Sequence, residues 1–363
     1  LEASRLFARS EINMGVDAFR DSLYAMLKRN TFLNIKFENM LDTLGEMSRT
    51  DLYSYLKEWE QLTPLPFYSI GEPELTKVVN KGGEEFFVLK VLVSNNSDYD
   101  GIIQMNVLQN GWWYQPMEDP RARKKVEIAA HTSKEFVSVW EEQIRDVEIN
   151  TMVSGNLPYM IRQSIGNVKQ ERNKIVKDTI YTLPESSLEM PGEVIVDNED
   201  STLFVLSTPA VVGLLPKWLD KVEDTSFKYS GISWWRAPLQ WTATTNAKYY
   251  GKYIRSAYVI KSGDGSQTAT WKIPVPEAGQ YELYYHVFKD DELRWNDRLQ
   301  GEYHFRVAYD SEMEDAYINL RKANEGWEQL GTYYFSADTV RVVLTDECKL
   351  RSVTADAVKI VKR

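Results

Sequence analysis

The 363-residue sequence is poor in the side chains that most often carry catalysis and metal binding. It contains three histidines, His131, His286 and His304, and one cysteine, Cys348. A single cysteine excludes an internal disulfide and a thiolate-rich zinc site. No His-Glu-x-x-His pair and no Gly-x-Ser-x-Gly elbow occurs. The sequence therefore predicts a chain without a catalytic centre, a metal site or a cofactor, in which Cys348 is a free structural thiol.

Basic residues and long apolar runs are also scarce. Lys and Arg number 43 against 53 Asp and Glu, for a net charge of −10. Because phosphates and anionic headgroups require a basic surface, nucleic acid and the membrane surface are poor candidate partners. The runs Phe86–Val93 and Val205–Leu215 fall short of the roughly 18 residues of a spanning helix. We expect no membrane segment. The opening Leu1-Glu2-Ala3 lacks a signal-peptide pattern and suggests a piece of a longer chain.

Helical periodicity dominates the first part of the chain. Apolar residues recur at three-to-four-residue spacing in three stretches. These are Val16, Phe19, Leu23 and Leu27; Phe37, Met40, Leu41, Leu44 and Met47; and Leu52, Tyr55, Leu56 and Trp59. Thr50 is positioned to cap the third helix, and Pro64 and Pro66 end it. The pattern predicts a helical segment over residues 1–66.

After Pro66 the period changes to the alternation typical of strands. Two strands flank a turn of Asn, Asp and Gly residues at 95–101, and further short strands follow. They predict a small Ig-like β-sandwich over residues 67–200, closed by a helix around Val168–Val176 and a strand before Asp197. Residues 201–224 are expected to be a linker. From residue 225 to 363, strands separated by Gly, Pro, Asn and Asp again predict a β-sandwich.

The polar clusters have two interpretations each. His286 and His304 lie in strands expected to be neighbours, so they either share a two-histidine site or pack separately. His131 is expected at the surface. The consecutive acidic turn Asp197–Asp200 is expected to be solvated rather than a calcium loop, because adjacent side chains cannot all converge on one ion.

Paired tryptophans are the most informative feature for binding. They are Trp112, Trp113, Trp234 and Trp235, with Trp241 nearby. In a strand, adjacent side chains point to opposite faces, so one of each pair can face outward and stack on a sugar or contact a partner. The alternative is that loops cover them, since tryptophan is mostly buried. All five are candidate ligand-binding residues.

Residues 225–363 resemble the golvesin C-terminal-like domain, which is attached to secreted and cell-envelope proteins, including xanthan-lyase-type polypeptides. The matching stretches are Lys248–Tyr253, Ala269–Trp271, Pro276–Tyr284, Gly326–Phe335 and Ala355–Lys359. The resemblance implies a jelly-roll fold, an extracytoplasmic location at the cell surface or in the periplasm, and no established catalytic residues. Apart from this resemblance, the residues of the same stretches predict turns and strands. Asp356 is expected to accept hydrogen bonds from neighbouring backbone amides.

Residues 1–200 resemble the C-terminal region of zinc aminopeptidases of the aminopeptidase N type, particularly bacterial forms fused to transporter-permease-like segments. The similarity lies in Val16–Phe19, Phe37–Leu44, Asp51–Trp59, Ser154–Pro158 and Gly192–Asp200. The zinc ligands of that family lie upstream of these elements. The resemblance therefore implies no catalytic residue in this chain.

Together these observations predict a multidomain, mainly β chain with an N-terminal helical segment. Its expected function is that of a non-catalytic accessory region of a peptidase-like cell-envelope protein, acting as scaffold and binding surface. Expected partners are the preceding domains of the parent protein and a glycan or envelope polymer. The alternative is a stand-alone carbohydrate-binding module that uses the tryptophans. A glycoside hydrolase or lyase would need paired carboxylates in a cleft.

Overall fold

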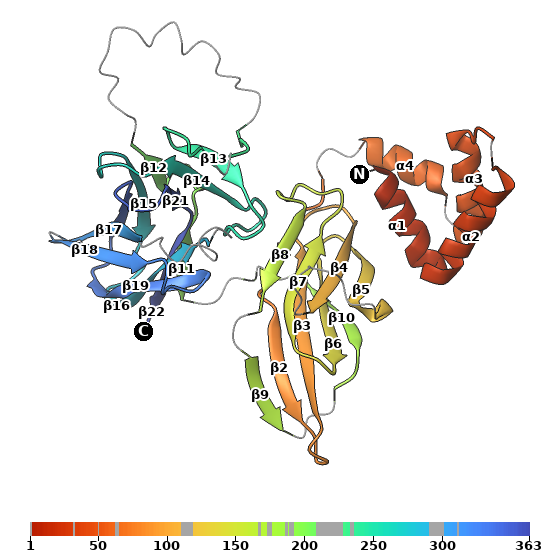
Figure 1. Ribbon diagram of the computed structural model, residues 1–363, viewed down its shortest axis with the longest axis horizontal. Coiled ribbons are helices and arrows are strands. Elements are labelled where there is room, and N and C mark those ends of the chain that lie inside the picture. The colour runs from red at the N-terminus through yellow and green to blue at the C-terminus, as the bar shows by residue number, and fades with distance from the viewer. Residues whose placement is uncertain are drawn as a thin grey trace, which may run out of the picture. The chain divides into compact units, whose positions relative to one another are not determined.

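The computed structural model is mainly β and divides into two compact units (Figure 1). Unit 1 comprises Leu1–Leu188 and unit 2 comprises Glu189–Arg363. The structure describes residues 2–31, 33–49, 51–61, 65–109, 119–165, 168–172, 176–185, 188, 192–207, 228–232, 236–289, 301–310 and 312–363. Each unit has its own apolar core, so each is considered by itself.

Unit 1 begins with four helices, continues with strands and contains one short 3-10 turn. Its elements are α1 (Glu2–Met14), α2 (Val16–Arg29), α3 (Phe37–Ser48), α4 (Leu52–Gln61), β1 (Tyr68–Ile70), β2 (Glu74–Val79), β3 (Glu85–Asn95), β4 (Gly101–Gln109), η1 (Pro120–Ala122), β5 (Arg123–Ile128), β6 (Thr132–Trp140), β7 (Ile144–Asn150), β8 (Met160–Ser164), β9 (Val168–Arg172) and β10 (Thr179–Pro184). The three helices predicted from periodicity correspond to α2, α3 and α4.

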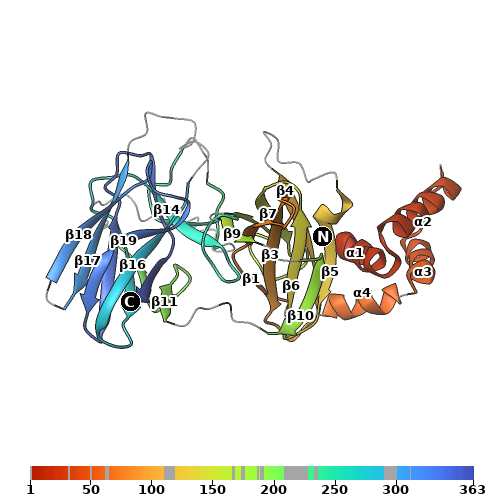
Figure 2. The same ribbon diagram turned by 90° about the horizontal axis from the view of Figure 1, so that it is seen from below.

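The helices pack through the apolar stripes that predicted them. Phe19, Leu41, Leu44 and Leu52 form their buried core. The predicted cap Thr50 lies outside the described residues, and Asp51 caps α4 by accepting from the Ser54 amide at 3.0 Å. α1 was not predicted, because its apolar residues serve two surfaces. Phe7 and Met14 pack on the helical core, whereas Ala8 and Ile12 pack beside β4 and β5 (Figure 2).

The strands of unit 1 form two sheets around one core. One sheet has the order β10-β6-β3-β2-β9, with β1 also paired to β3, and the other has the order β5-β4-β7-β8. Trp140, Val91 and Val147 are among the buried residues between them. The helix predicted around Val168–Val176 is wrong at its start. Residues 168–172 form β9, which pairs in parallel with the edge of β2 and satisfies the backbone groups of that edge.

Unit 2 contains strands only among its described elements. They are β11 (Glu193–Val196), β12 (Phe204–Leu206), β13 (Thr242–Thr245), β14 (Ser256–Lys261), β15 (Thr268–Pro274), β16 (Gly279–Val287), β17 (Glu302–Tyr309), β18 (Glu312–Asn319), β19 (Gly326–Phe335), β20 (Thr339–Thr345), β21 (Ser352–Ala355) and β22 (Val358–Lys362). The alternation that predicted strands after residue 268 is confirmed.

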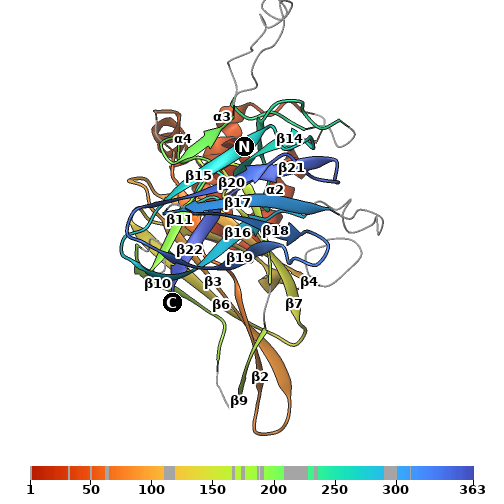
Figure 3. The same cartoon turned by 90° about the vertical axis from the view of Figure 1, so that its left-hand side faces the viewer.

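Two sheets of unit 2 share one core. One has the order β11-β22-β16-β19 and the other the order β12-β15-β20-β17-β18, in which β15, β20 and β17 lie side by side (Figure 3). A third sheet has the order β13-β14-β21. Alternate residues of β16, from Tyr281 to Val287, point into the core, so the residues between them face outward. The domain boundary predicted at residue 200 differs from this arrangement, because β11 pairs with β22 and β12 pairs with β15.

Candidate functional site

Four of the five tryptophans predicted to bind ligand lie outside the described residues. They are Trp112, Trp113, Trp234 and Trp235. Trp241 is described, and its half-buried side chain packs against the core of unit 2. Its indole Nε1 is buried and has no hydrogen-bond partner among the described residues. Whether Trp241 contacts a ligand stays a prediction.

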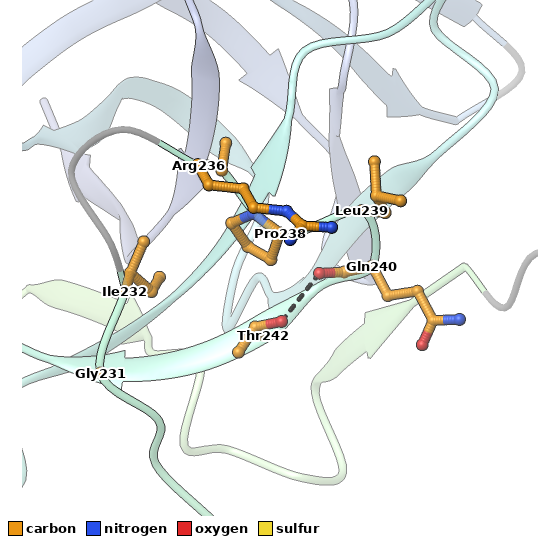
Figure 4. Close-up of a pocket in the computed structure, with 8 residues that line it drawn as sticks. Gly231, Ile232, Arg236, Pro238, Leu239, Gln240 and Thr242 are labelled. Carbon is orange, nitrogen blue, oxygen red and sulfur yellow. Dashed lines mark hydrogen bonds between the residues drawn. The ribbon is translucent and has the colours of Figure 1, made fainter. Parts of the chain in front are cut away.

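A cavity of about 480 Å³ is lined by residues on either side of Trp241 in the sequence (Figure 4). We call it the Arg236 cavity, and it is lined by Gly231, Ile232, Arg236, Ala237, Pro238, Leu239, Gln240 and Thr242. The residues that flank Trp241 in the sequence line the cavity, whereas Trp241 packs on the core. This follows from the extended chain, in which neighbouring side chains point to opposite sides. The predicted tryptophan was thus one position away from the cavity lining.

Hydrogen bonds hold the cavity wall against the strands of unit 2. The carbonyl of Pro238 accepts from the Lys261 amide at 2.7 Å, next to the end of β14. The Ser230 amide donates to the carbonyl of Ala243 on β13 at 2.8 Å. The Thr242 hydroxyl donates to the Gln240 carbonyl at 2.9 Å (Figure 4). The lining is therefore anchored on both sides to the sheet β13-β14-β21.

A second group of side chains lies on the outward side of the sheet β11-β22-β16-β19. We call it the aromatic face and define it by Tyr250, Tyr284, His286, Trp327 and Lys359. His286 on β16 is directly opposite Trp327 on β19, and Tyr284 is opposite Lys359 on β22. Strand pairing thus brings together residues from three strands. Sequence reasoning placed four of these residues, all but His286, in golvesin-like stretches but assigned those stretches scaffold roles.

The buried carboxylate of Asp356 fixes one edge of the aromatic face. Asp356 is fully buried at the break between β21 and β22. It bonds to His286 Nδ1 at 2.8 Å and accepts from the Tyr250 amide at 3.1 Å and 3.2 Å. Burial raises the pKa of Asp356, and the interaction with His286 opposes that rise. Because Nδ1 bonds to the carboxylate, any further hydrogen bond of the His286 ring is made through Nε2.

The rings of the aromatic face contact one another at angles far from parallel. The centroids of Tyr250 and Trp327 are 5.0 Å apart, and those of His286 and Trp327 are 5.1 Å apart with planes at 77°. The Lys359 ammonium lies 4.8 Å from the Trp327 centroid and pairs with Glu193 at 3.0 Å. Trp327 is half-buried. The rings are therefore fixed by contacts on several sides before any ligand arrives.

The loop that carries Tyr250 requires a glycine. Gly251 has φ +151°, and a Cβ at this position would lie 1.9 Å from the Ile254 carbonyl oxygen. Its neighbour Tyr249 is buried and meets Phe288 edge-on at 4.7 Å. The golvesin-like Tyr-Tyr-Gly stretch therefore anchors one tyrosine in the interior and sets the next one on the aromatic face.

The acidic turn at 197–200 is more buried than predicted. Asn198 is buried and donates to the Ser256 hydroxyl at 2.7 Å. Glu199 accepts from Lys228 at 2.5 Å, from Tyr229 at 3.0 Å and from Ser256. The expectation of a solvated turn is therefore wrong, because the turn follows β11 into unit 2 and its polar groups find partners there.

Two acids of this turn have pKa values shifted in opposite directions. Burial raises the pKa of Asp197 well above its usual value, and the charge of Asp356 adds to that rise. Burial also acts to raise the pKa of Glu199, but its hydrogen bonds with Lys228, Ser256 and Tyr229 outweigh burial and leave the pKa lowered. Three donors thus lower the pKa of Glu199, whereas burial raises the pKa of Asp197.

The other histidines do not join the aromatic face. His304 lies on β17, in the sheet opposite that of His286, and bonds to Asp315 at 2.8 Å. This contradicts the alternative of a shared two-histidine site. His131 lies at the surface of unit 1, as predicted, where it bonds to Asp98 and Glu185.

Neither a metal site nor a membrane span is found in the described part of the chain. No group of three or more His, Cys, Asp or Glu residues there is arranged to hold a metal ion. None of the helices described in the structure combines the length and apolarity needed to cross a membrane. Cys348 is half-buried, and burial raises the pKa of its thiol, which lowers its reactivity.

Comparison with known families gives one match, which covers part of the chain. Residues 234–362 match the family model of the Golvesin C-terminal domain. This confirms the golvesin resemblance seen in the sequence for that part of unit 2. No curated protein matches the chain. The aminopeptidase resemblance of residues 1–200 stays a prediction.

Among solved structures, the chain is similar to parts of larger enzymes. A Paenibacillus xanthan lyase is 16% identical with a TM-score of 0.33, over 83% of this chain and 26% of that chain. A Bacteroides uniformis β-glucuronidase 2 variant is 11% identical with a TM-score of 0.23, over 87% of this chain and 33% of that chain. This chain thus spans about a quarter to a third of their lengths. Because the identities and TM-scores are low, the activities of these proteins are not transferred to it.

Proposed function

We propose that this chain is a non-catalytic accessory region of an extracytoplasmic protein, and that its aromatic face binds carbohydrate. The observation that carries the proposal is the set of half-buried rings of Tyr250, Tyr284 and Trp327, fixed around His286 on one side of a sheet. Rings of this kind offer apolar faces to the C–H surfaces of sugars, and their hydroxyl or N–H groups can form hydrogen bonds. Carbohydrate ligands suit this mixture of apolar and polar groups.

The strand order of unit 2 supports the jelly-roll part of the proposal. If β21 and β22 count as one interrupted strand, eight strands form the orders β14-β21/β22-β16-β19 and β15-β20-β17-β18. Two such interleaved four-stranded sheets are the arrangement of a jelly roll, a fold that occurs in lectin domains. In unit 1, the orders β2-β3-β6 and β5-β4-β7-β8 support an Ig-like sandwich in the same way.

The absence of catalysis is also part of the proposal. The Asp356 carboxylate is buried, and its bonds to Tyr250 and His286 give it a positioning role rather than access to a substrate. The golvesin match supports an accessory domain of a secreted or cell-envelope protein. The peptidase-like character of the parent protein rests on the sequence resemblance of residues 1–200.

Titration with neutral oligosaccharides tests the aromatic face. Isothermal titration calorimetry would use cellohexaose, xylohexaose, mannohexaose and chitohexaose. We expect at least one of them to bind the intact chain. The substitutions Trp327→Ala and Tyr284→Ala should each weaken that binding about tenfold or more, which corresponds to ~1.4 kcal/mol.

Tyr181→Ala is the matched control, because Tyr181 is a 50% exposed tyrosine on β10 of unit 1. It should leave the affinity unchanged. If none of the four ligands binds the intact chain, or if Trp327→Ala and Tyr284→Ala bind as tightly as the parent sequence, carbohydrate binding by the aromatic face is wrong. The chain would then be a scaffold.

A further inference from the structure

The Arg236 cavity contains a guanidinium group that pairs with no acidic residue among those the structure describes. Arg236 is exposed, and its side chain crosses the cavity between Ile232 and Leu239 (Figure 4). No residue in the described part of the chain forms an ion pair with it, and none of the residues that line the cavity is acidic. Other basic residues of unit 2 do pair with acids: Lys228 with Glu199, Lys248 with Glu325, Lys359 with Glu193, Lys362 with Glu277, and Arg363 with Glu282.

The lack of an ion pair between Arg236 and any described residue is informative because the whole chain has more acidic than basic residues. With 53 acidic against 43 basic residues, a shortage of carboxylates does not explain an arginine without an ion pair. An arginine that lines a cavity and stays unpaired is therefore available to an anion from outside. The planar fork of a guanidinium binds a carboxylate through two parallel hydrogen bonds, which adds geometric selectivity to the charge.

The rest of the lining fits a group larger than a simple anion. Ile232, Pro238 and Leu239 provide apolar surface next to the guanidinium, and Leu239 is 73% exposed. Gln240 and Thr242 provide an amide and a hydroxyl. A cavity of about 480 Å³ is in the size range of small-molecule sites. A sugar ring offers a C–H face to the apolar wall and hydroxyls to the amide.

We propose that the Arg236 cavity binds an acidic sugar, with the sugar carboxylate paired to Arg236 and the ring against Pro238 and Leu239. This is a second site, separate from the aromatic face and built by the segment that leads into β13. It rests on the proposed function only in that both sites take carbohydrate. The anchoring of the wall to Lys261 and Ala243 keeps the lining in place when the cavity is empty.

Calorimetric titration of the full chain with trigalacturonate tests this inference at low ionic strength, where charge pairing is least screened. The comparison ligand is the fully methyl-esterified trimer, which keeps the rings and loses the charge. We expect trigalacturonate to bind at least tenfold more tightly than the ester. Arg236→Gln should remove this preference, and Arg236→Lys should retain part of it.

Arg341→Gln is the control, because Arg341 is an exposed arginine on β20 that does not line the cavity. It should bind trigalacturonate as the parent sequence does. Equal binding of acid and ester, or an unchanged acid preference in Arg236→Gln, overturns the inference. Equally tight, Arg236-dependent binding of an N-acetylated tripeptide carboxylate overturns the sugar assignment.

The Trp327→Ala variant separates this inference from the proposed function. It should keep the acid preference of the Arg236 cavity although it loses binding of neutral sugars. If Trp327→Ala abolishes trigalacturonate binding as well, the acid binds at the aromatic face and the Arg236 cavity is not its site. If no neutral sugar binds but trigalacturonate binding depends on Arg236, only the proposed aromatic face fails.

Discussion

At the scale of single residues, Asp356 shows how one buried charge can organise a surface. Its carboxylate joins the Tyr250 amide and the His286 ring, which lie 106 and 70 positions away in the sequence. A buried carboxylate without such partners would carry a large desolvation penalty. Loss of either bond would therefore disturb both the loop that carries Tyr250 and the orientation of His286.

Glu199 gives a pH-dependent prediction. Its pKa is lowered in the folded protein because the donors Lys228, Ser256 and Tyr229 outweigh burial. A lowered folded-state pKa contributes stability above the unfolded value of 4.5, and this stability is lost as the pH falls through the folded-state pKa. We expect Glu199→Gln to lower the free energy of unfolding by about 1–3 kcal/mol at pH 7.

The difference between Glu199→Gln and the parent sequence should shrink as the pH falls below the unfolded-state pKa. Urea unfolding at a series of pH values, followed by tryptophan fluorescence, measures it. Glu302→Gln, an exposed position on β17, serves as the control. A deficit in Glu199→Gln that stays constant from neutral to acidic pH would contradict the assigned role of the charge.

The roles of single residues could be predicted only in part from the sequence. Sequence reasoning expected Asp356 to accept from neighbouring backbone amides, but its partners come from a distant loop and a distant strand. The acidic turn was expected to be solvated because four consecutive polar residues usually face water. Only the pairing of β11 with β22 brings this turn to Ser256. Such contacts depend on tertiary pairing that no local pattern contains.

At the scale of elements, β12 tests where unit 2 begins. The sequence predicted a linker over residues 201–224, yet Phe204 on β12 is buried against Trp271 at a centroid distance of 5.4 Å. We expect Phe204→Ala to destabilise unit 2 by about 3–5 kcal/mol, the usual range for removing a buried aromatic side chain. Chemical unfolding of the full chain measures this loss.

The neighbouring residue provides the control for β12. Val205 is 46% exposed, so Val205→Ala should change stability by no more than about 0.5 kcal/mol. If Phe204→Ala is as mild as Val205→Ala, the strand contributes nothing to the core and the linker prediction was correct.

Regular elements were the best-predicted part of the fold. Apolar stripes predicted α2, α3 and α4, and alternation predicted β15, β16, β17 and β20 because one face of each strand is buried. The stretch at 168–172 was predicted as helix because it is polar with widely spaced valines. Its strand conformation comes from the exposed edge of β2, which supplies backbone partners. β12 is three residues long, too short for any periodicity to show.

At the scale of the whole molecule, the chain forms two units with separate cores, and both proposed binding sites lie in unit 2. Unit 1 combines helices with a β-sandwich, and unit 2 carries both the aromatic face and the Arg236 cavity. Alternating strand patterns correctly indicated a mainly β chain, and the length of the chain indicated more than one domain. These features could not locate the candidate sites, because four of the five tryptophans on which the sequence argument depended lie outside the described residues and the fifth packs on the core.

Hydrogen–deuterium exchange of the full chain, with and without the tightest-binding neutral oligosaccharide, tests the proposed function most directly. Ligand contact slows exchange where it closes local openings of the backbone. The account predicts protection in the peptides that contain residues 284–287 of β16 and 326–329 of β19, and none in unit 1. Protection confined to unit 1, or no protection at a saturating ligand concentration, would contradict carbohydrate binding by the aromatic face.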